Sequence, residues 1–212
     1  MISSVTGEPV HPHANGAIDQ RGYSVAVRRD TDEHLLVEFV TARLLLRELT
    51  DADHASVHGP ATDPEVTRYT DWGPNTPQAT AAFLAEAQRT AARRPRTHFT
   101  LAVVERRDGG LIGTVGLGVT SPEQHRGQMG YWVARPHWGC GYATAAARSV
   151  LDFAFDQLKL HKVVATCDPE NAASARVLEK IGMQREGYLR GDRLIRGQWR
   201  DRLLFAAIAA HE

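Results

Sequence analysis

Short apolar runs alternate with longer amphipathic stretches along the chain, a pattern that predicts strands and helices in turn. Two of the apolar runs flank Arg107-Asp108-Gly109-Gly110, a turn sequence typical of a β-hairpin. The strands are expected at residues 41–49, 97–105, 111–119, 128–135, 162–167, 184–189 and 201–208.

Helices are predicted where apolar residues recur every three or four positions. The first follows the capping sequence Thr50-Asp-Ala-Asp, and the segment 67–77, with its glycine and prolines, is expected to be a loop. The other helices are expected at 77–93, from Tyr142 to about 158, and at 171–181. This order of elements predicts an α/β fold in which helices flank a mixed sheet.

The chain has 212 residues, which is enough for one domain of ordinary size. Residues 1–35 are predicted to be a flexible N-terminal tail, because the first thirty or so show no apolar periodicity. Residues 36–212 are then the single domain. The arginine-rich run at 93–96 is expected to be a solvated helix exit.

Composition excludes several classes of protein. Twenty-five basic residues balance 25 acidic ones, which argues against a broad affinity for nucleic acid. No apolar run is long enough to span a membrane, and the N-terminus lacks the apolar core of a secretory signal. Two cysteines are too few for a disulfide framework or a four-thiolate zinc site. A cytoplasmic protein without a metal is expected.

The segment Gly139-Cys140-Gly141 carries the clearest chemical signal, because it joins a predicted strand to the helix that begins at Tyr142. Two glycines permit backbone torsions closed to other residues, and a helix N-terminus offers unpaired N–H groups to an anion. The alternative is a simple tight turn. Neither the P-loop pattern nor the full dinucleotide fingerprint is present.

The surroundings of these glycines resemble the GNAT acyl-CoA N-acyltransferases, specifically their RimJ/RimL-like branch. The likeness covers about residues 38–210 and rests on four ordered motifs. These are Thr41-Ala-Arg-Leu-Leu-Leu-Arg-Glu-Leu (opening strand), Pro136-His-Trp-Gly139-Cys140-Gly141 (pyrophosphate loop, continued by Tyr142-Ala143-Thr144), Asn171-Ala-Ala-Ser174-Ala-Arg-Val-Leu-Glu-Lys180-Ile-Gly182-Met183 (later helix) and Gly197-Gln-Trp-Arg-Asp201 (penultimate turn).

The resemblance implies that acetyl-CoA is the cosubstrate and that an amine attacks its thioester directly. The N–H of Trp132 or Val133 would stabilise the oxyanion, Asn171 would bind the pantetheine arm or a water, and Ser174 would protonate or solvate the departing thiolate. An N-cap for Asn171 and an exposed helix hydroxyl for Ser174 are the alternatives. The implied cofactor-binding residues are Trp132, Val133, Ala134, Trp138, Gly139, Cys140, Gly141, Tyr142, Ala143, Thr144 and Asn171.

Two departures from the family pattern affect the acid and the base. Leu178 stands where many relatives place a tyrosine that acts as the general acid, so a tyrosine acid is excluded there, and Gln128 stands where many carry a glutamate as the general base. Base duty therefore falls to water or another group, since Glu123 and His125 are expected to be surface loop residues. Freeing a lysine-like amine at pH 7 costs about 4.6 kcal/mol, against about 1 to 1.4 for an α-amine. We therefore expect a protein N-terminal α-amine or another amine of low pKa.

Asp71 and Trp72 lie where the branch builds part of its acceptor channel, although a loop-anchoring role explains them equally well. Cys140 lacks the partners of a nucleophile and is expected to be a packing residue. The alternative functions are acetylation of a small-molecule amine, such as an antibiotic or metabolite, and a non-catalytic acyl-CoA-binding protein. A homodimer is left open.

Overall fold

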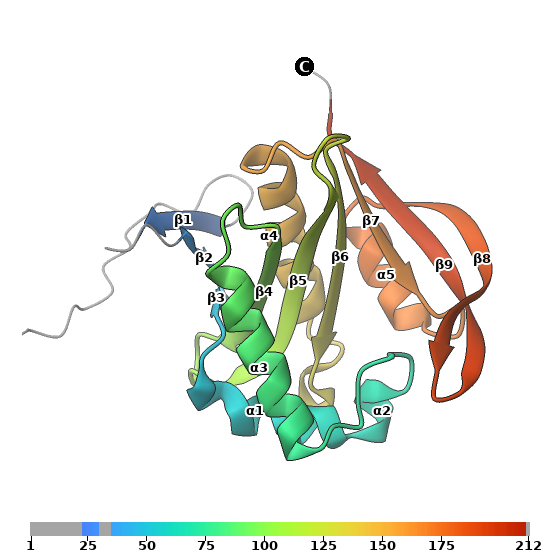
Figure 1. Ribbon diagram of the computed structural model, residues 1–212, viewed down its shortest axis with the longest axis horizontal. Coiled ribbons are helices and arrows are strands. Elements are labelled where there is room, and N and C mark those ends of the chain that lie inside the picture. Colours follow the sequence, from blue (N-terminus) through green and yellow to red (C-terminus); the bar gives the residue numbers. More distant parts are fainter. Residues whose placement is uncertain (1–22, 30–34, 211–212) are drawn as a thin grey trace, which may run out of the picture.

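The computed structural model describes residues 23–29 and 35–210. Within these residues one sheet has the strand order β1-β2-β3-β4-β5-β6-β7-β9-β8 (Figure 1). The strands are β1 (Tyr23–Arg29), β2 (Leu35–Thr41), β3 (Leu44–Glu48), β4 (His98–Glu105), β5 (Leu111–Ser121), β6 (Arg126–Val133), β7 (Lys162–Cys167), β8 (Gln184–Ile195) and β9 (Gln198–Ile208). The helices are α1 (His54–Thr62), α2 (Pro64–Thr67), α3 (Pro77–Ala91), α4 (Tyr142–Asp156) and α5 (Ala172–Lys180), with 3₁₀ turns η1 (Asp51–Asp53) and η2 (Arg135–His137).

Neighbouring strands are antiparallel except for β6 and β7, which confirms the predicted mixed sheet. That parallel pair is short, since it joins only Arg126 to Lys162, Gly127 to Val163 and Gln128 to Val164. Beyond Gln128 the two strands part, and β6 continues to Val133 paired with β5 alone. One edge of β6 is therefore left without a strand partner in the middle of the sheet.

Helices cover both faces of this sheet, with α1 and α3 on one face and α4 and α5 on the other (Figure 1). Strand β4 shows why, because its side chains alternate between two cores. Leu101 and Val103 belong to the larger core with α4, whereas Ala102 and Val104 pack with α3 residues such as Leu84. The strand is apolar on both faces because both are covered.

The structure corrects three of the predicted boundaries. Residues Tyr23–Arg29 form β1 and pair with β2, so this part of the predicted tail is a strand; 1–22 and 30–34 lie outside the described residues. Helix α2 was not predicted. Strands β8 and β9 form a longer hairpin than expected, because Arg196 and Gly197 turn the chain with positive φ only after residue 195.

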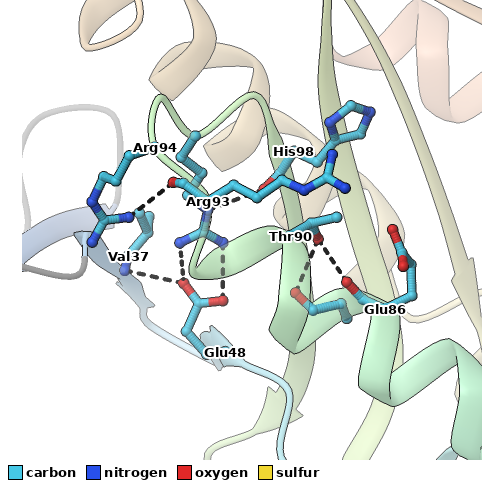
Figure 2. Close-up of polar contacts among 9 residues, drawn as sticks. Val37, Glu48, Glu86, Thr90, Arg93, Arg94 and His98 are labelled. Atoms are coloured by element: carbon cyan, nitrogen blue, oxygen red, sulfur yellow. Dashed lines mark hydrogen bonds and ion pairs between the residues drawn. The ribbon is translucent and has the colours of Figure 1, made fainter.

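The arginine-rich helix exit is also only partly solvated. The side chain of Arg96 is 3% exposed, and its guanidinium binds both carboxylate oxygens of Glu48 at 2.7 and 3.0 Å. The same carboxylate accepts a hydrogen bond from the Val37 backbone (Figure 2). This buried ion pair ties the start of β4 to β2 and β3, so the expectation of a solvated run is wrong at Arg96.

Candidate active site

The loop before α4 has the conformation that its glycines predicted. Gly139 has φ of 75° and Gly141 has φ of 78°, both in the left-handed region. The first helical hydrogen bond runs from Ala145 N–H to the Gly141 carbonyl. The N–H groups of residues 142–144 therefore have no backbone acceptor among the described residues, and they form a potential anion site at the positive end of the helix dipole.

Arg43, in the turn between β2 and β3, holds this loop from the side. Its Nη2 donates to the Cys140 carbonyl at 2.9 Å, and its guanidinium lies 4.7 Å from the centre of the Tyr142 ring. The Tyr142 hydroxyl in turn donates to Glu105 of β4. The loop is thus fixed to the β2–β3 turn and to β4, both of which lie far from it in the sequence.

A cavity of about 570 Å³ extends from this loop along the free edge of β6. The N–H of Ala134 donates to the Ile112 carbonyl at 2.8 Å, on the β5 side. Because N–H groups point alternately to the two sides of a strand, the N–H of Val133 points away from β5, toward the gap. The residues that line the cavity include Tyr131, Trp132, Val133, Trp138, Gly139, Gly141, Tyr142, Ala143, Thr144, Asn171 and Ser174.

Two of the implied cofactor-binding residues have backbone N–H groups that are already bonded within the protein. The N–H of Ala134 is already bonded, and the N–H of Trp138 donates to the Arg135 carbonyl at 3.1 Å. The indole of Trp138 donates to the Val133 carbonyl at 2.6 Å. The thiol of Cys140 is exposed, so the prediction that it packs in the interior is wrong.

A second cavity, of about 560 Å³, lies between the segment after α2, the strands β4 to β7 and the β8–β9 hairpin. Asp71 and Trp72 both line it. The carboxylate of Asp71 pairs with Arg193 at 3.1 Å, and the ring of Trp72 stacks on Trp132 with centroids 5.4 Å apart. The indole N–H of Trp72 is buried without a hydrogen-bond partner.

The two cavities meet, because six residues line both of them: Tyr69, Thr70, Tyr131, Trp132, Asn171 and Ser174. Asn171 caps α5, where its side-chain oxygen accepts from the Ser174 N–H at 3.0 Å. The hydroxyl of Ser174 lies 3.1 Å from that of Tyr131. The structure therefore brings the two residues predicted for the thiol end of the cofactor to the junction of both cavities.

Tyr131 is a residue that sequence reasoning missed. Its burial raises the pKa of the phenol to about 12, so the hydroxyl stays protonated at neutral pH. Tyr131 stands two positions before Val133 on β6, so their side chains lie on the same face of the strand, and this two-residue period was the signal that could have identified Tyr131.

The two residues that depart from the family pattern, Gln128 and Leu178, lie in different surroundings. Gln128 lines the second cavity, and its amide cannot accept a proton there. Leu178 is 1% exposed and belongs to the core. Glu123 and His125 are exposed between β5 and β6 and line neither cavity.

Residues 43–184 of this chain match the acetyltransferase (GNAT) domain family. The N-acetyltransferase p20 of Bacillus licheniformis is 32% identical over 170 residues, which is 79% of this chain and 94% of that protein. The structure of Mycobacterium smegmatis RimJ in complex with CoA-disulfide superposes with a TM-score of 0.69 at 29% identity, covering 78% of this chain and 82% of that one. Spermidine N(1)-acetyltransferase of Escherichia coli is 31% identical over 94 residues, covering 44% of this chain and 50% of that protein.

The chain belongs to the GNAT acetyltransferase family. It is an acyl-CoA-dependent acetyltransferase, and acetyl-CoA is its cosubstrate. The fold, the free edge of β6 and the amide-rich turn before α4 all agree with that class. The non-catalytic alternative is therefore no longer needed. Within the described residues no helix is long and apolar enough to cross a bilayer, and no group of three or more potential metal ligands occurs.

Proposed function

We propose that the protein transfers the acetyl group of acetyl-CoA to an α-amine, such as the N-terminus of a protein, by direct attack in a ternary complex. The observation that supports this most is the meeting of two cavities at Asn171 and Ser174. One cavity carries the unpaired amides of α4 for the cosubstrate, and the other gives an amine its own approach. Direct transfer needs no acyl-enzyme, which fits the exposed and unassisted Cys140.

The backbone of Val133 is the proposed oxyanion donor. Of the two candidates from the sequence, the alternation along β6 favours Val133, because its N–H points into the gap while that of Trp132 points to β5. An amide donor at this place acts where negative charge develops on the thioester oxygen. The pyrophosphate would rest on the N–H groups of residues 142–144.

Ser174 and Asn171 would act on the cofactor's thiol end. The side-chain oxygen of Asn171 is occupied by the Ser174 N–H, which leaves the amide nitrogen as the donor toward the pantetheine arm. The hydroxyl of Tyr131 would orient Ser174 through hydrogen bonds to its backbone carbonyl and its hydroxyl. When the carbon–sulfur bond breaks, the Ser174 O–H would donate to the thiolate, while the amine's proton leaves to water.

The environment of Gln128 supports an acceptor that needs little help to lose a proton. No carboxylate replaces the missing glutamate at that position of β6, and a strong base is required chiefly for amines of high pKa. An α-amine at pH 7 is unprotonated far more often than a lysine-like amine. A small-molecule amine of low pKa, such as an antibiotic or a metabolite, would satisfy the same chemistry.

The decisive experiment is an initial-rate assay of thiol release with DTNB and acetyl-CoA. The panel should contain short peptides with free N-termini, lysine with its α-amine blocked, spermidine and small amines. Turnover of the α-amino peptides above the others supports the proposal. Turnover of lysine side chains or spermidine, with none of the peptides, would refute it.

Three finer expectations from the sequence stay part of this proposal. They are membership of the RimJ/RimL-like branch, a cytoplasmic location and a homodimer. The similarity to RimJ supports the first, and sedimentation of the purified protein would test the third.

A further inference from the structure

We propose that the second cavity recognises an oxygen on the carbon next to the reacting amine, through the guanidinium of Arg202. The acceptor is then an α-amino carbonyl compound: either a peptide N-terminus or a free amino acid. This inference rests on the proposed function, because it assigns the acceptor side of the same site.

Arg202, on β9, is a buried cation whose N–H donors mostly lack a hydrogen-bond acceptor among the described residues. The residue is 7% exposed, yet within the described residues its single hydrogen bond runs from Nη1 to the Tyr69 carbonyl at 3.1 Å. Its Nε is buried without a partner, and no carboxylate of residues 23–29 or 35–210 pairs with it. A guanidinium has five N–H donors, and burying such a charge is costly unless an acceptor meets it.

Two other arginines in or beside the cavity each have a carboxylate partner, although Nε of Arg193 and one oxygen of Asp168 are buried without a hydrogen bond. Asp71 pairs with Arg193, and the buried carboxylate of Asp168 pairs with Arg200, each at 3.1 Å. Arg202 is thus the lining cation left without a carboxylate among the described residues. The buried indole N–H of Trp72 is a second donor without a partner in the same lining. Around Arg202 the cavity therefore complements an oxygen acceptor, and an ammonium group placed there would be repelled by the guanidinium; the carboxylate of Asp168 is held by Arg200.

The position of Arg202 suits such a contact. Its neighbour Leu203 pairs with Cys167, so Arg202 lies at the carboxyl end of β7. Asn171 follows Cys167 by four positions in the chain, and it caps α5 at the junction with the cofactor cavity. Arg202 and Asn171 therefore both lie near the carboxyl end of β7, where the two cavities meet.

A matched series of acceptors tests this directly. L-Alaninamide, L-alanine and isopropylamine share one carbon frame, but isopropylamine lacks the carbonyl group. Rates are compared as kcat/KM per unit of unprotonated amine, in the wild type, Arg202→Met and Arg196→Met. Arg196 is the control, because its Nη2 also holds the segment after α2, at the Thr67 and Gly73 carbonyls, without lining the cavity.

The wild type and Arg196→Met should prefer the carbonyl compounds over isopropylamine by roughly 10-fold or more, the range of a hydrogen bond to a charged group. In Arg202→Met this preference should disappear while the KM for acetyl-CoA is unchanged. A higher rate with L-alanine identifies a free carboxylate as the oxygen, and a higher rate with L-alaninamide identifies a peptide. A preference that survives in Arg202→Met, or that is lost equally in Arg196→Met, overturns the proposal.

Binding separates this proposal from the proposed function. N-acetyl-L-alaninamide and N-isopropylacetamide can be titrated calorimetrically into the protein with CoA, which needs no turnover. If only the first binds, and Arg202→Met abolishes that binding, the recognition holds even where α-amine transfer is not observed. Equal binding of both compounds to the wild type would refute it.

Discussion

The hydroxyl of Tyr131 on β6 lies 3.1 Å from the hydroxyl of Ser174 on α5, although 43 positions separate them in the chain. Tyr131 also donates to the Ser174 backbone carbonyl at 3.2 Å. This pair crosses the gap that opens where β6 and β7 part, and both residues line both cavities. The short parallel pairing of β6 and β7 thus creates the space, and the two hydroxyls span it.

Ser174→Ala should lower kcat more than it weakens acetyl-CoA binding. A hydroxyl that donates to the departing thiolate acts mainly in the transition state, so its loss appears in the rate. We expect a fall in kcat of about 10-fold or more and a change in Kd of less than about 3-fold. Steady-state kinetics and calorimetry measure the two quantities, and an unchanged kcat would remove Ser174 from the mechanism.

Tyr131→Phe should lower kcat by a smaller factor than Ser174→Ala, because it removes only the partner that orients the serine. The double variant should be no slower than Ser174→Ala, since the tyrosine acts through the serine. With a pKa of about 12, the phenol should add no ionisation to the kcat profile between pH 6 and about 10. Additive losses in the double variant would show that Tyr131 acts independently.

Arg43→Met should weaken CoA binding by about 3-fold to 10-fold. The variant removes the hydrogen bond to the Cys140 carbonyl and a cation beside the pyrophosphate loop. Arg107→Met is the matched control, because Arg107 is an exposed arginine in the β4–β5 turn and lines neither cavity. Equal Kd values for the two variants would mean that Arg43 does not hold the loop.

Asp53→Asn should reduce the free energy of unfolding by about 2 kcal/mol at pH 7, the range for hydrogen bonds to charged groups. Burial alone would raise the pKa of Asp53, but hydrogen bonds from Arg47 and Thr50, together with the arginine's charge, outweigh it and lower the pKa. The carboxylate binds both terminal nitrogens of Arg47, at 2.7 and 2.8 Å. It also accepts from the Thr50 N–H at the start of η1.

The lowered pKa of Asp53 determines how its contribution to the free energy of unfolding changes with pH. A carboxyl whose pKa is lowered by folding contributes fully above its unfolded value near 3.8, and the contribution is lost as the pH falls below it. Urea unfolding at pH 7 and near pH 3 should therefore show a difference between wild type and variant that shrinks in acid. Asp51→Asn, in the same turn and exposed, is the control. A difference independent of pH would contradict the ion-pair account.

Features with local causes could be predicted from the sequence. The glycine turn before α4, the caps at Thr50 and Asn171 and the hairpin at Gly109 depend on a few neighbouring residues, and the structure confirms each of them. The contacts of Tyr131 with Ser174 and of Arg202 with Tyr69 could not be predicted in this way. These contacts join residues more than 40 positions apart, and no local pattern encodes them.

Arg96 and Cys140 are two residues whose burial was predicted wrongly from the sequence. Arg96 stands in a charged run that suggests solvent, yet Glu48 lies 48 positions earlier in the chain and meets it in the interior. Cys140 belongs to a residue type that is usually buried, yet it is exposed in a turn between two glycines of positive φ. In both cases the tertiary neighbourhood decided the outcome, and the residue type alone was misleading.

The central claim is that main-chain amides at the start of α4 hold the diphosphate of CoA. Calorimetric titration of the purified protein with CoA tests it most directly, in the wild type, Gly141→Val and Gly109→Val. Both glycines have positive φ, where a β-branched residue is strained, but only Gly141 lies in the loop, with a new Cβ 3.4 Å from Arg43 Nη2. We predict one site per chain, weakened at least about 10-fold in Gly141→Val and unchanged in Gly109→Val. No heat with the wild type, or equal affinity in all three proteins, would contradict the account.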